Sequence, residues 1–330
     1  MLPPKKDFAL LYQLHQENAI LLFMPEYGKL TPGDIMRNKI KGILSLLIAT
    51  VIWGSTFVAQ SVGMDHIGPF TFLSVRNFVA VIFLMLVIAL FEVKTIKDYW
   101  KKWNDKTLWL SGFLCGTALF VAAGLQQIGM VYTDAGKAGF LTAMYIVLVP
   151  IIGVFLGKKL SFMAVISVAI AVVGLYLLSC VGVTEINNGD LLLIACALAF
   201  SFQITLIDRW VSKVDVLRLN CVQSLVVAVL SGVCMLLFEE PSLDNIMNCW
   251  LPIGYAAILS TGVAYSLQIV GQRHLETTSA SLLMSLESVF AVISGWLILN
   301  ERMTPAEYTG CALMFVAVIL SQIPTKKAPV

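Results

Sequence analysis

Apolar runs of membrane-spanning length fill most of this chain, and short polar gaps separate them. Six stretches without any Asp, Glu, Lys or Arg reach the roughly 20 residues that a helix needs to cross a bilayer. Only 13% of the residues are charged, about half the share in a soluble domain, and the net charge of +2 does not indicate a nucleic-acid partner. The chain is therefore predicted to lie in a lipid bilayer. The charge-free stretches cover residues 42–64, 107–133, 138–157, 160–184, 219–238 and 245–272.

The sequence predicts an all-α integral membrane fold with ten transmembrane helices. The apolar runs are divided at charges, at Gly, Pro and Asn clusters and at helix caps. Thr304-Pro-Ala-Glu307 reads as a capping box with proline at the first helical position. Pro150 is expected to kink the fourth helix near Gly153. The ten expected helices cover residues 42–62, 70–91, 107–129, 135–156, 161–180, 190–208, 217–238, 251–271, 278–299 and 305–323.

The basic residues predict how these helices are oriented. If the N-terminus is cytoplasmic, 19 of the 22 Lys and Arg residues fall on the cytoplasmic side. Only Lys137 and Arg302 then fall outside, and Arg76 lies within the second helix. The opposite orientation would invert that ratio. The positive-inside rule therefore predicts a multi-pass protein with both termini in the cytoplasm.

The two halves of the chain resemble each other in sequence. A repeat of five helices crosses the membrane an odd number of times, so the second repeat must be inverted relative to the first. The lysine-rich loop 92–106 then corresponds to loop 239–250, which has no Lys or Arg. Two inverted five-helix repeats are typical of secondary transporters, whose site lies near the midplane between the halves. The matching segments are 42–53 with 189–200, 132–139 with 275–282, and 157–161 with 300–304.

This arrangement divides the chain into a first repeat at residues 42–180 and a second repeat at residues 190–323. Residues 1–41 are expected to form an N-terminal cytoplasmic tail, and residues 324–330 a C-terminal cytoplasmic tail. Met36 is an alternative start, because the first 35 residues show no pattern that could pack. The seven cysteines and three histidines show no metal-ligand spacing, so we expect neither a metal site nor a cofactor.

Five sequence segments, in this order and spacing and within the duplicated ten-helix layout, resemble the EamA-type transporters of the drug/metabolite transporter superfamily. The resemblance covers about residues 40–323. It implies a permease of the bacterial inner membrane, most often an exporter of amino acids, related metabolites or drugs. The segments are Ile52-Trp-Gly-Ser-Thr-Phe57, Arg76, Ala138-Gly-Phe-Leu-Thr-Ala-Met-Tyr145, Ser285-Leu-Glu287 and Gly295-Trp-Leu-Ile-Leu-Asn-Glu-Arg302.

The chain departs from the family pattern after the fourth helix of the first repeat. Where the family often has Glu, this sequence has Lys158 and Lys159, whereas the second repeat keeps Glu301. The first of these loops is expected to face the cytoplasm and the second to face outward. The positive-inside rule accounts for the difference.

Polar and aromatic residues at helical spacing mark faces that could line a cavity for a solute. The alternative, which the sequence leaves open, is that they only bind helices to one another. One such face carries Ala49, Trp53, Thr56 and Gln60 of the first helix, and another carries Thr261, Tyr265, Gln268 and Gln272 of the eighth. The candidate substrate-binding residues are Trp53, Thr56, Gln60, Arg76, Asn77, Tyr145, Gln203, Gln223, Tyr265 and Gln268.

Two charged residues within the apolar runs are the sharpest candidates. Arg76 offers a planar fork of donors to a carboxylate or phosphate, or else it extends to headgroups and backbone carbonyls. Glu287 lies deeper, on a different face of its helix from the small residues that suit close packing. It is either a proton-coupling site or a structural carboxylate, with Lys137 as a conceivable partner.

The sequence therefore predicts a secondary active transporter that exports small organic metabolites, such as amino acids, by alternating access. An uptake permease of the same fold stays open as an alternative. An intramembrane enzyme is a further alternative, although no H-E-x-x-H or P-loop motif occurs. The expected partners are a small-molecule substrate and the lipid bilayer, together with protons if Glu287 couples transport to them. The oligomeric state cannot be predicted.

Overall fold

The computed structural model describes residues 32–92, 96–133, 135–179, 187–299 and 302–323, and these residues form helices and no strands. Eight helical segments are long and apolar enough to cross a membrane, and α8 and α16 are shorter apolar helices of the same kind. The ten crossing segments are α2 (Pro32–Met64), α3 (Pro69–Glu92), α5 (Lys106–Gly129), α6 and α7 (Ala135–Ala143 and Tyr145–Phe155), α8 (Phe162–Ser179), α9 (Asn188–Trp210), α10 (Val216–Phe238), α12, η1 and α13 (Trp250–Tyr255, Ala256–Ala264 and Tyr265–His274), α14 and α15 (Thr277–Met284 and Glu287–Leu299) and α16 (Pro305–Ser321).

The predicted all-α membrane fold with ten crossings is confirmed, and most helix ends agree with the expected ones to within three residues. The exception is α2, which begins at Pro32 rather than at residue 42. Proline is favourable at a first helical position and Asp34 lies in the first turn, so both residues suit a helix start. The predicted capping box of α16 is present, since Thr304 and Glu307 each accept the other's backbone N–H. Residues 1–31 and 324–330 lie outside the described part of the chain.

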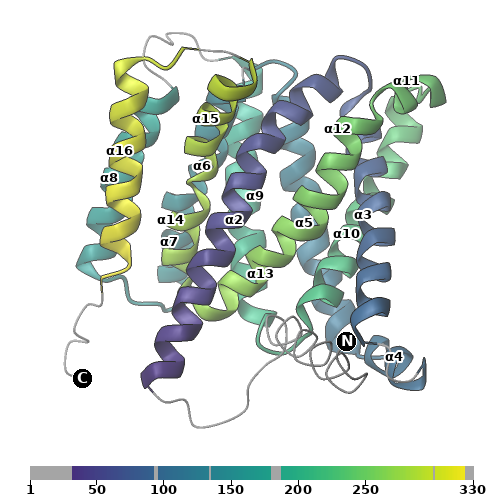
Figure 1. Cartoon of the computed structure of the whole chain (residues 1–330), viewed down its shortest axis with the longest axis horizontal. Helices are drawn as coiled ribbons and strands as arrows, with labels where there is room; N and C mark the ends of the chain where they lie inside the picture. Colours follow the sequence, from purple (N-terminus) through teal and green to yellow (C-terminus); the bar gives the residue numbers. More distant parts are fainter. Residues whose placement is uncertain (1–31, 93–95, 134, 180–186, 300–301, 324–330) are drawn as a thin grey trace, which may run out of the picture.

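The helices pack in a pattern that is unchanged when the two halves are exchanged. The second helices of the halves, α3 and α10, pack on each other, and so do the fifth helices, α8 and α16. Likewise α5 packs on α9, while its counterpart segment α12–α13 packs on α2. Figure 1 shows α8 and α16 side by side at one edge of the bundle and α3 and α10 at the other. The two five-helix repeats are therefore related by the inversion that their odd helix count requires.

The fourth segment of each half is broken at its middle. In the first half the break is at Met144, between α6 and α7, and in the second it is at Ser285–Leu286, between α14 and α15. Both breaks are tightened turns, because Leu286 N–H donates to Leu283 O at 3.1 Å and Val147 N–H donates to Met144 O at 3.0 Å. The break in the first half lies six residues before Pro150, and α7 continues through that proline to Phe155.

Basic side chains gather at one end of the bundle, which we call the basic end. It is the end where α2 begins, where α16 ends and where the short helix α4 (Ile96–Trp103) lies (Figure 1). Lys39 Nζ donates to Gln322 O at 2.7 Å and so links the start of α2 to the end of α16. Arg273 donates to the carbonyls of Val211 and Val214 in the turn between α9 and α10.

The opposite end of the bundle is acidic at its edge. Glu239, which follows α10, accepts hydrogen bonds from the backbone N–H groups of Phe70 and Thr71 at 2.8 Å and from the Thr71 hydroxyl at 2.6 Å. These N–H groups belong to the first turn of α3, where a helix has unpaired donors and favours negative charge. The carboxylate thus fastens α3 to its repeat counterpart α10.

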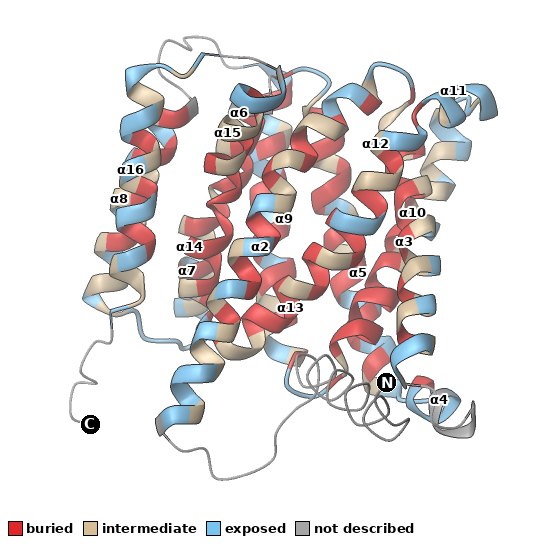
Figure 2. Ribbon diagram, in the orientation of Figure 1, coloured by how far each residue is buried: buried red, intermediate tan, exposed pale blue. Residues whose placement is uncertain are grey.

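The outer surface is apolar and the interior contacts are close. Leu90 and Leu236 are 76% and 73% exposed, as expected of side chains that face lipid. Figure 2 shows buried residues on the inward faces of the helices. Lipid offers no hydrophobic force between helices, so their association depends on close packing. Gly174 of α8 and Gly310 of α16 allow these two helices to pack closely, because a Cβ atom at Gly310 would lie 2.7 Å from the Gly174 carbonyl oxygen.

Candidate functional site

A small cavity lies at the level of the two helix breaks, between the halves of the bundle. Its volume is about 40 Å³, which is room for roughly three water molecules. Both halves contribute to its wall. The lining residues are Trp53, Thr56, Phe57 and Gln60 of α2, Arg76 of α3, Gln126 of α5, Thr142 of α6, Tyr145 of α7, Phe200 and Ile204 of α9, Ser260 of η1, Tyr265 and Gln268 of α13, Met284 of α14 and Glu287 of α15.

Arg76 faces this cavity and not the edge of the membrane. Its side chain is buried, its Nη1 donates to Gln60 Oε1 at 3.0 Å, and its guanidinium lies 5.7 Å from the centroid of the Phe72 ring. Its Nε is buried without a hydrogen-bond partner. A buried donor without a partner is unfavourable unless water or a ligand satisfies it. The guanidinium therefore keeps a donor with which it can bind a carboxylate.

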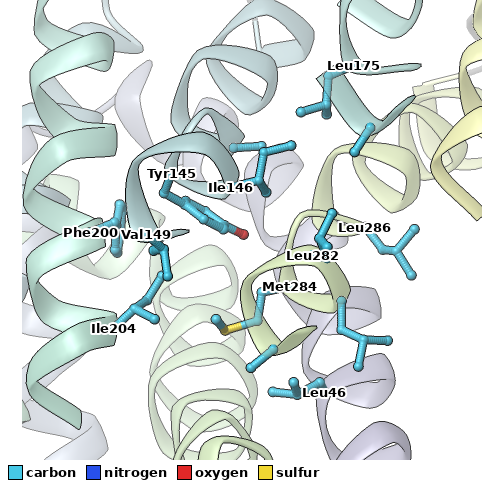
Figure 3. Close-up of a cluster of buried hydrophobic side chains, with 14 of the residues drawn as sticks. Leu46, Tyr145, Ile146, Val149, Leu175, Phe200, Ile204, Leu282, Met284 and Leu286 are labelled. Carbon is cyan, nitrogen blue, oxygen red and sulfur yellow. The ribbon is translucent and has the colours of Figure 1, made fainter. Parts of the chain in front are cut away.

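Glu287 lies at the break of the second half. It is the first residue of α15 and is 7% exposed. Its Oε1 accepts a hydrogen bond from the hydroxyl of Tyr145 at 3.0 Å, and Tyr145 is the first residue of α7. Figure 3 shows the Tyr145 hydroxyl directed from α7 toward the segment that carries Leu282 and Leu286. The first turn of a half-helix in a membrane favours negative charge, which suits a carboxylate at this position.

Lys137, which we considered as a partner for Glu287, binds elsewhere. Its Nζ donates to Asp190 Oδ2 at 2.6 Å, close to the end of the bundle opposite the basic end. Among the residues that the structure describes, neither Glu287 nor Arg76 has an ion-pair partner. An ionised side chain in hydrocarbon is costly, so a buried arginine and a buried glutamate without ion-pair partners suit the binding of a ligand or of protons.

Aromatic rings form the rest of the wall. Trp53 and Tyr265 meet edge to face, with ring centroids 5.1 Å apart, and Tyr145 and Phe200 do so at 6.4 Å. The Trp53 Nε1 donor and the Gln268 Oε1 acceptor are buried without partners. Two residues of the wall therefore carry a donor and an acceptor that no protein group satisfies.

The eighth segment reaches the cavity through a π-helix, η1, which the sequence did not reveal. Nine residues, Ala256–Ala264, adopt this wider helix, and Tyr265 follows it directly. The wider turn places Ser260 at the cavity instead of the expected Thr261. The carbonyls of Thr261 and Gly262 accept hydrogen bonds from the Asn220 side chain of α10 at 2.9 and 3.1 Å. π-Helices are rare in proteins, and those that do occur are often found at functional sites.

A model of the EamA-like transporter family matches residues 40–180 and 187–322. The chain belongs to the EamA-like transporter family. An uncharacterized transporter of Archaeoglobus fulgidus is 33% identical over 278 residues, which cover 84% of each chain. The uncharacterized transporter YoaV of Bacillus subtilis is 23% identical over 86% of this chain and 97% of its own.

Two further similarities are narrower. The threonine/homoserine exporter RhtA of Escherichia coli is 35% identical, but over only 78 residues, which cover 23% of this chain and 26% of RhtA. A crystal structure with 18% sequence identity has a TM-score of 0.69 and covers 85% of this chain and 96% of its own. At that identity the structure supports the fold alone. The family match and these relatives identify a multi-pass membrane transporter of the EamA-like family.

Eight of the eleven candidate residues line the cavity of this EamA-like protein, and three do not. Asn77 donates to the Leu73 carbonyl of its own helix at 2.8 Å, and Gln223 donates to Asn220 Oδ1 at 3.0 Å. Gln203 lies behind the wall, where its Oε1 accepts a hydrogen bond from Gln268 at 3.2 Å. These three side chains hold helices or other side chains in place.

Besides Ser260, two polar residues of the wall are absent from the candidates that the sequence suggested. Gln126 Nε2 donates to Thr142 Oγ1 at 3.3 Å, and both side chains line the cavity. The consecutive amides Gln126 and Gln127 within an otherwise apolar run were an available signal. The apolar members Phe57, Phe200 and Met284 carried no such signal, because apolar residues occur throughout these helices.

Proposed function

We propose that this chain is a secondary active exporter of a small zwitterionic metabolite, such as an amino acid, and that it works by alternating access in the bacterial inner membrane. One observation carries the proposal. Arg76 of the first repeat and Glu287 of the second line one cavity, and neither has an ion-pair partner among the described residues. A solute with a carboxylate and an ammonium group would complement both charges at once.

The remaining wall suits such a solute. In our proposal the carboxylate binds the guanidinium of Arg76, which Gln60 orients, and the ammonium group lies between Glu287 and the faces of Trp53 and Tyr265. Tyr145 orients the carboxylate of Glu287. Thr56 and Gln268 complete the set of proposed contacts. The cavity would have to widen to hold an amino acid, since its volume is about 40 Å³.

Glu287 is also the proposed coupling site for protons. A carboxylate inside the membrane is costly when ionised, so it favours taking up either a proton or a cationic group. If proton and solute compete for this carboxylate, entry of a proton from outside releases the solute there. The transmembrane pH gradient would then drive export.

The basic end is the proposed cytoplasmic end, because the Lys and Arg residues concentrate there. Both termini would then be cytoplasmic. The direction of transport rests on the similarity to the threonine/homoserine exporter RhtA over 78 residues and stays a proposal for this chain.

The decisive experiment identifies the solute first and measures transport second. Cells with and without the protein are compared for extracellular and intracellular metabolites, and export predicts that one zwitterionic solute is enriched outside only when the protein is present. The purified protein is then reconstituted in liposomes with that solute labelled. Enrichment inside the cells would favour uptake. A chemically altered product would favour an enzyme.

A further inference from the structure

Helix α9 meets the broken segment α6–α7 along one seam, and an ion pair lies at each end of it. At the end opposite the basic end, Lys137 Nζ is 2.6 Å from Asp190 Oδ2. At the basic end, Lys158 Nζ is 2.6 Å from Asp208 Oδ2. Between the two pairs, the same helices line the central cavity. Two lysine–aspartate pairs thus bracket the central cavity along this seam.

A second and larger hollow lies along this seam at the basic end. Its volume is about 390 Å³, and Val149 and Gly153 of α7 and Thr205 of α9 form part of its wall. Val149 is one helical turn from Tyr145, and Thr205 adjoins Ile204; both of these neighbours line the central cavity. About one turn of helix therefore separates the two spaces. Lys158 and Asp208 lie at the wall of the larger one.

The two ion pairs differ in burial. The side chains of Lys137 and Asp190 are 13% and 3% exposed, and those of Lys158 and Asp208 are 48% and 25% exposed. Asp190 also accepts from the Thr133 hydroxyl at 3.2 Å and from the backbone N–H of Asn187 at 2.9 Å. Breaking a buried pair leaves an uncompensated charge, whereas a half-exposed pair contributes little net stability and opens readily.

The turn after α7 aims Lys158 at the seam. Gly157 has φ of +83°, a left-handed conformation that favours glycine. The following N–H, of Lys158, donates back to the Gly153 carbonyl at 2.8 Å, which closes the end of α7. The Lys158 side chain then donates to Asp208 of α9 and, at 2.7 Å, to the hydroxyl of Thr277 at the start of α14. One lysine therefore joins three helical segments at the wall of the hollow.

We propose that the hollow at the basic end is the vestibule through which the solute passes, and that the Lys158–Asp208 pair is the releasable latch that closes it. Lys137–Asp190 holds the opposite end of the seam shut in this conformation. The vestibule rests on the proposed transport function. The latch itself is a property of the free protein and is tested without any solute.

The test measures how fast a cysteine inside the vestibule reacts. Thr205→Cys is placed in the full-length protein with its seven cysteines replaced, and an uncharged maleimide labels it in detergent. Asp208→Asn or Lys158→Gln should raise the labelling rate, by up to about fivefold for a half-exposed pair. The exchange of both residues, Lys158→Asp with Asp208→Lys, should restore the parent rate.

Lys159→Gln is the matched control, because it removes the same charge from the neighbouring position, and it should leave the rate unchanged. Equal labelling in the parent and in both neutralised variants would overturn the latch, as would an equal increase in Lys159→Gln. If the pair is only structural, the neutralised variants lose their monodisperse elution peak and the charge exchange does not recover it. A labelling result that supports the latch while liposomes show no transport would reject the proposed function and retain the conformational device.

Discussion

The hydroxyl of Tyr145 donates to the carboxylate of Glu287 across the boundary between the two repeats, at 3.0 Å. Each residue begins the second half of a broken helix, α7 in one repeat and α15 in the other. The bond therefore joins the two interruptions at the level of the cavity. It couples the position of one half-helix to that of the other.

Loss of the hydrogen bond from Tyr145 should impair transport because it disturbs Glu287, and for no other reason. A hydrogen bond to a charged acceptor contributes about 1.5–3 kcal/mol, so we expect Tyr145→Phe to lower the rate of solute exchange in liposomes about tenfold or more. In a Glu287→Gln background the same change should cost little further, because residues in contact do not act additively. Tyr265→Phe is the control, since it removes a hydroxyl from the same cavity and leaves this bond intact. Losses that add in the double variant would contradict the coupling.

Neutralising Glu287 should separate movement of the solute from its accumulation. A proton drives the cycle only if it favours one state of the carrier over another. Glu287→Gln should therefore still exchange labelled for unlabelled solute across liposomes but fail to concentrate the solute under an imposed pH gradient. Accumulation equal to the parent's would exclude Glu287 as the coupling site. Loss of exchange in a normally folded variant would assign the residue to binding or to structure.

Replacing Arg76 should weaken solute binding. Its planar fork can hold a carboxylate by two parallel hydrogen bonds, which a lysine cannot reproduce. We expect Arg76→Ala to reduce affinity about 10- to 100-fold, which corresponds to one lost charge-assisted contact, and Arg76→Lys to retain part of it. Binding is measured on the detergent-purified protein with the solute identified from cells. Parental affinity in a correctly inserted Arg76→Ala protein would show that the arginine has only a structural role.

The carboxylate that fastens α3 to α10 should matter for stability and not for binding. Glu239 accepts three hydrogen bonds from the first turn of α3, and loss of such a helix cap costs about 0.5–2 kcal/mol. Glu239→Ala should lower the apparent melting temperature in detergent. Glu240→Ala removes the adjacent, exposed carboxylate and should leave it nearly unchanged. An equal fall in both variants would point to a general effect of charge.

The orientation is tested by single-cysteine labelling of intact cells. A cysteine at the exposed Asp244, in the short helix α11 (Leu243–Asn248), should react with an impermeant maleimide, and a cysteine at the exposed Lys101 of α4 should not. Permeabilised cells provide the control, because both sites should react there. The reverse pattern would place the basic end outside.

The helix positions were predictable because hydrocarbon allows only long apolar helices with charges at their ends. The breaks at Met144 and at Ser285–Leu286 were not, since neither site contains Pro or Gly. The π-helix also escaped detection, and it moved Ser260 to the cavity in place of Thr261. A periodicity of 3.6 residues assigns faces correctly only where the helix is regular.

Equivalent positions in the two repeats do not have equivalent roles, so the role of one residue did not predict that of its counterpart. Arg76 and Gln223 occupy equivalent places in the two halves, yet only Arg76 reaches the cavity. Gln223 and Ser224 instead direct their side chains to Asn220 Oδ1, the amide whose nitrogen supports the π-helix. The same position thus serves the site in one half and helix packing in the other, a difference that depends on tertiary contacts.

The two broken segments have a consequence for the surrounding lipid. In the apolar stretches of these two segments, 56% and 61% of the residues are buried. The corresponding share is 39% in α3 and in α10, which form one edge of the bundle. Bending at the midplane would displace these more buried half-helices and would alter the lipid-facing perimeter less than a movement of α3 or α10. A bilayer resists changes in the hydrophobic thickness that a protein presents to it. A carrier that moved mainly in this way would perform little work against that elasticity, and we therefore expect its turnover to depend weakly on acyl-chain length.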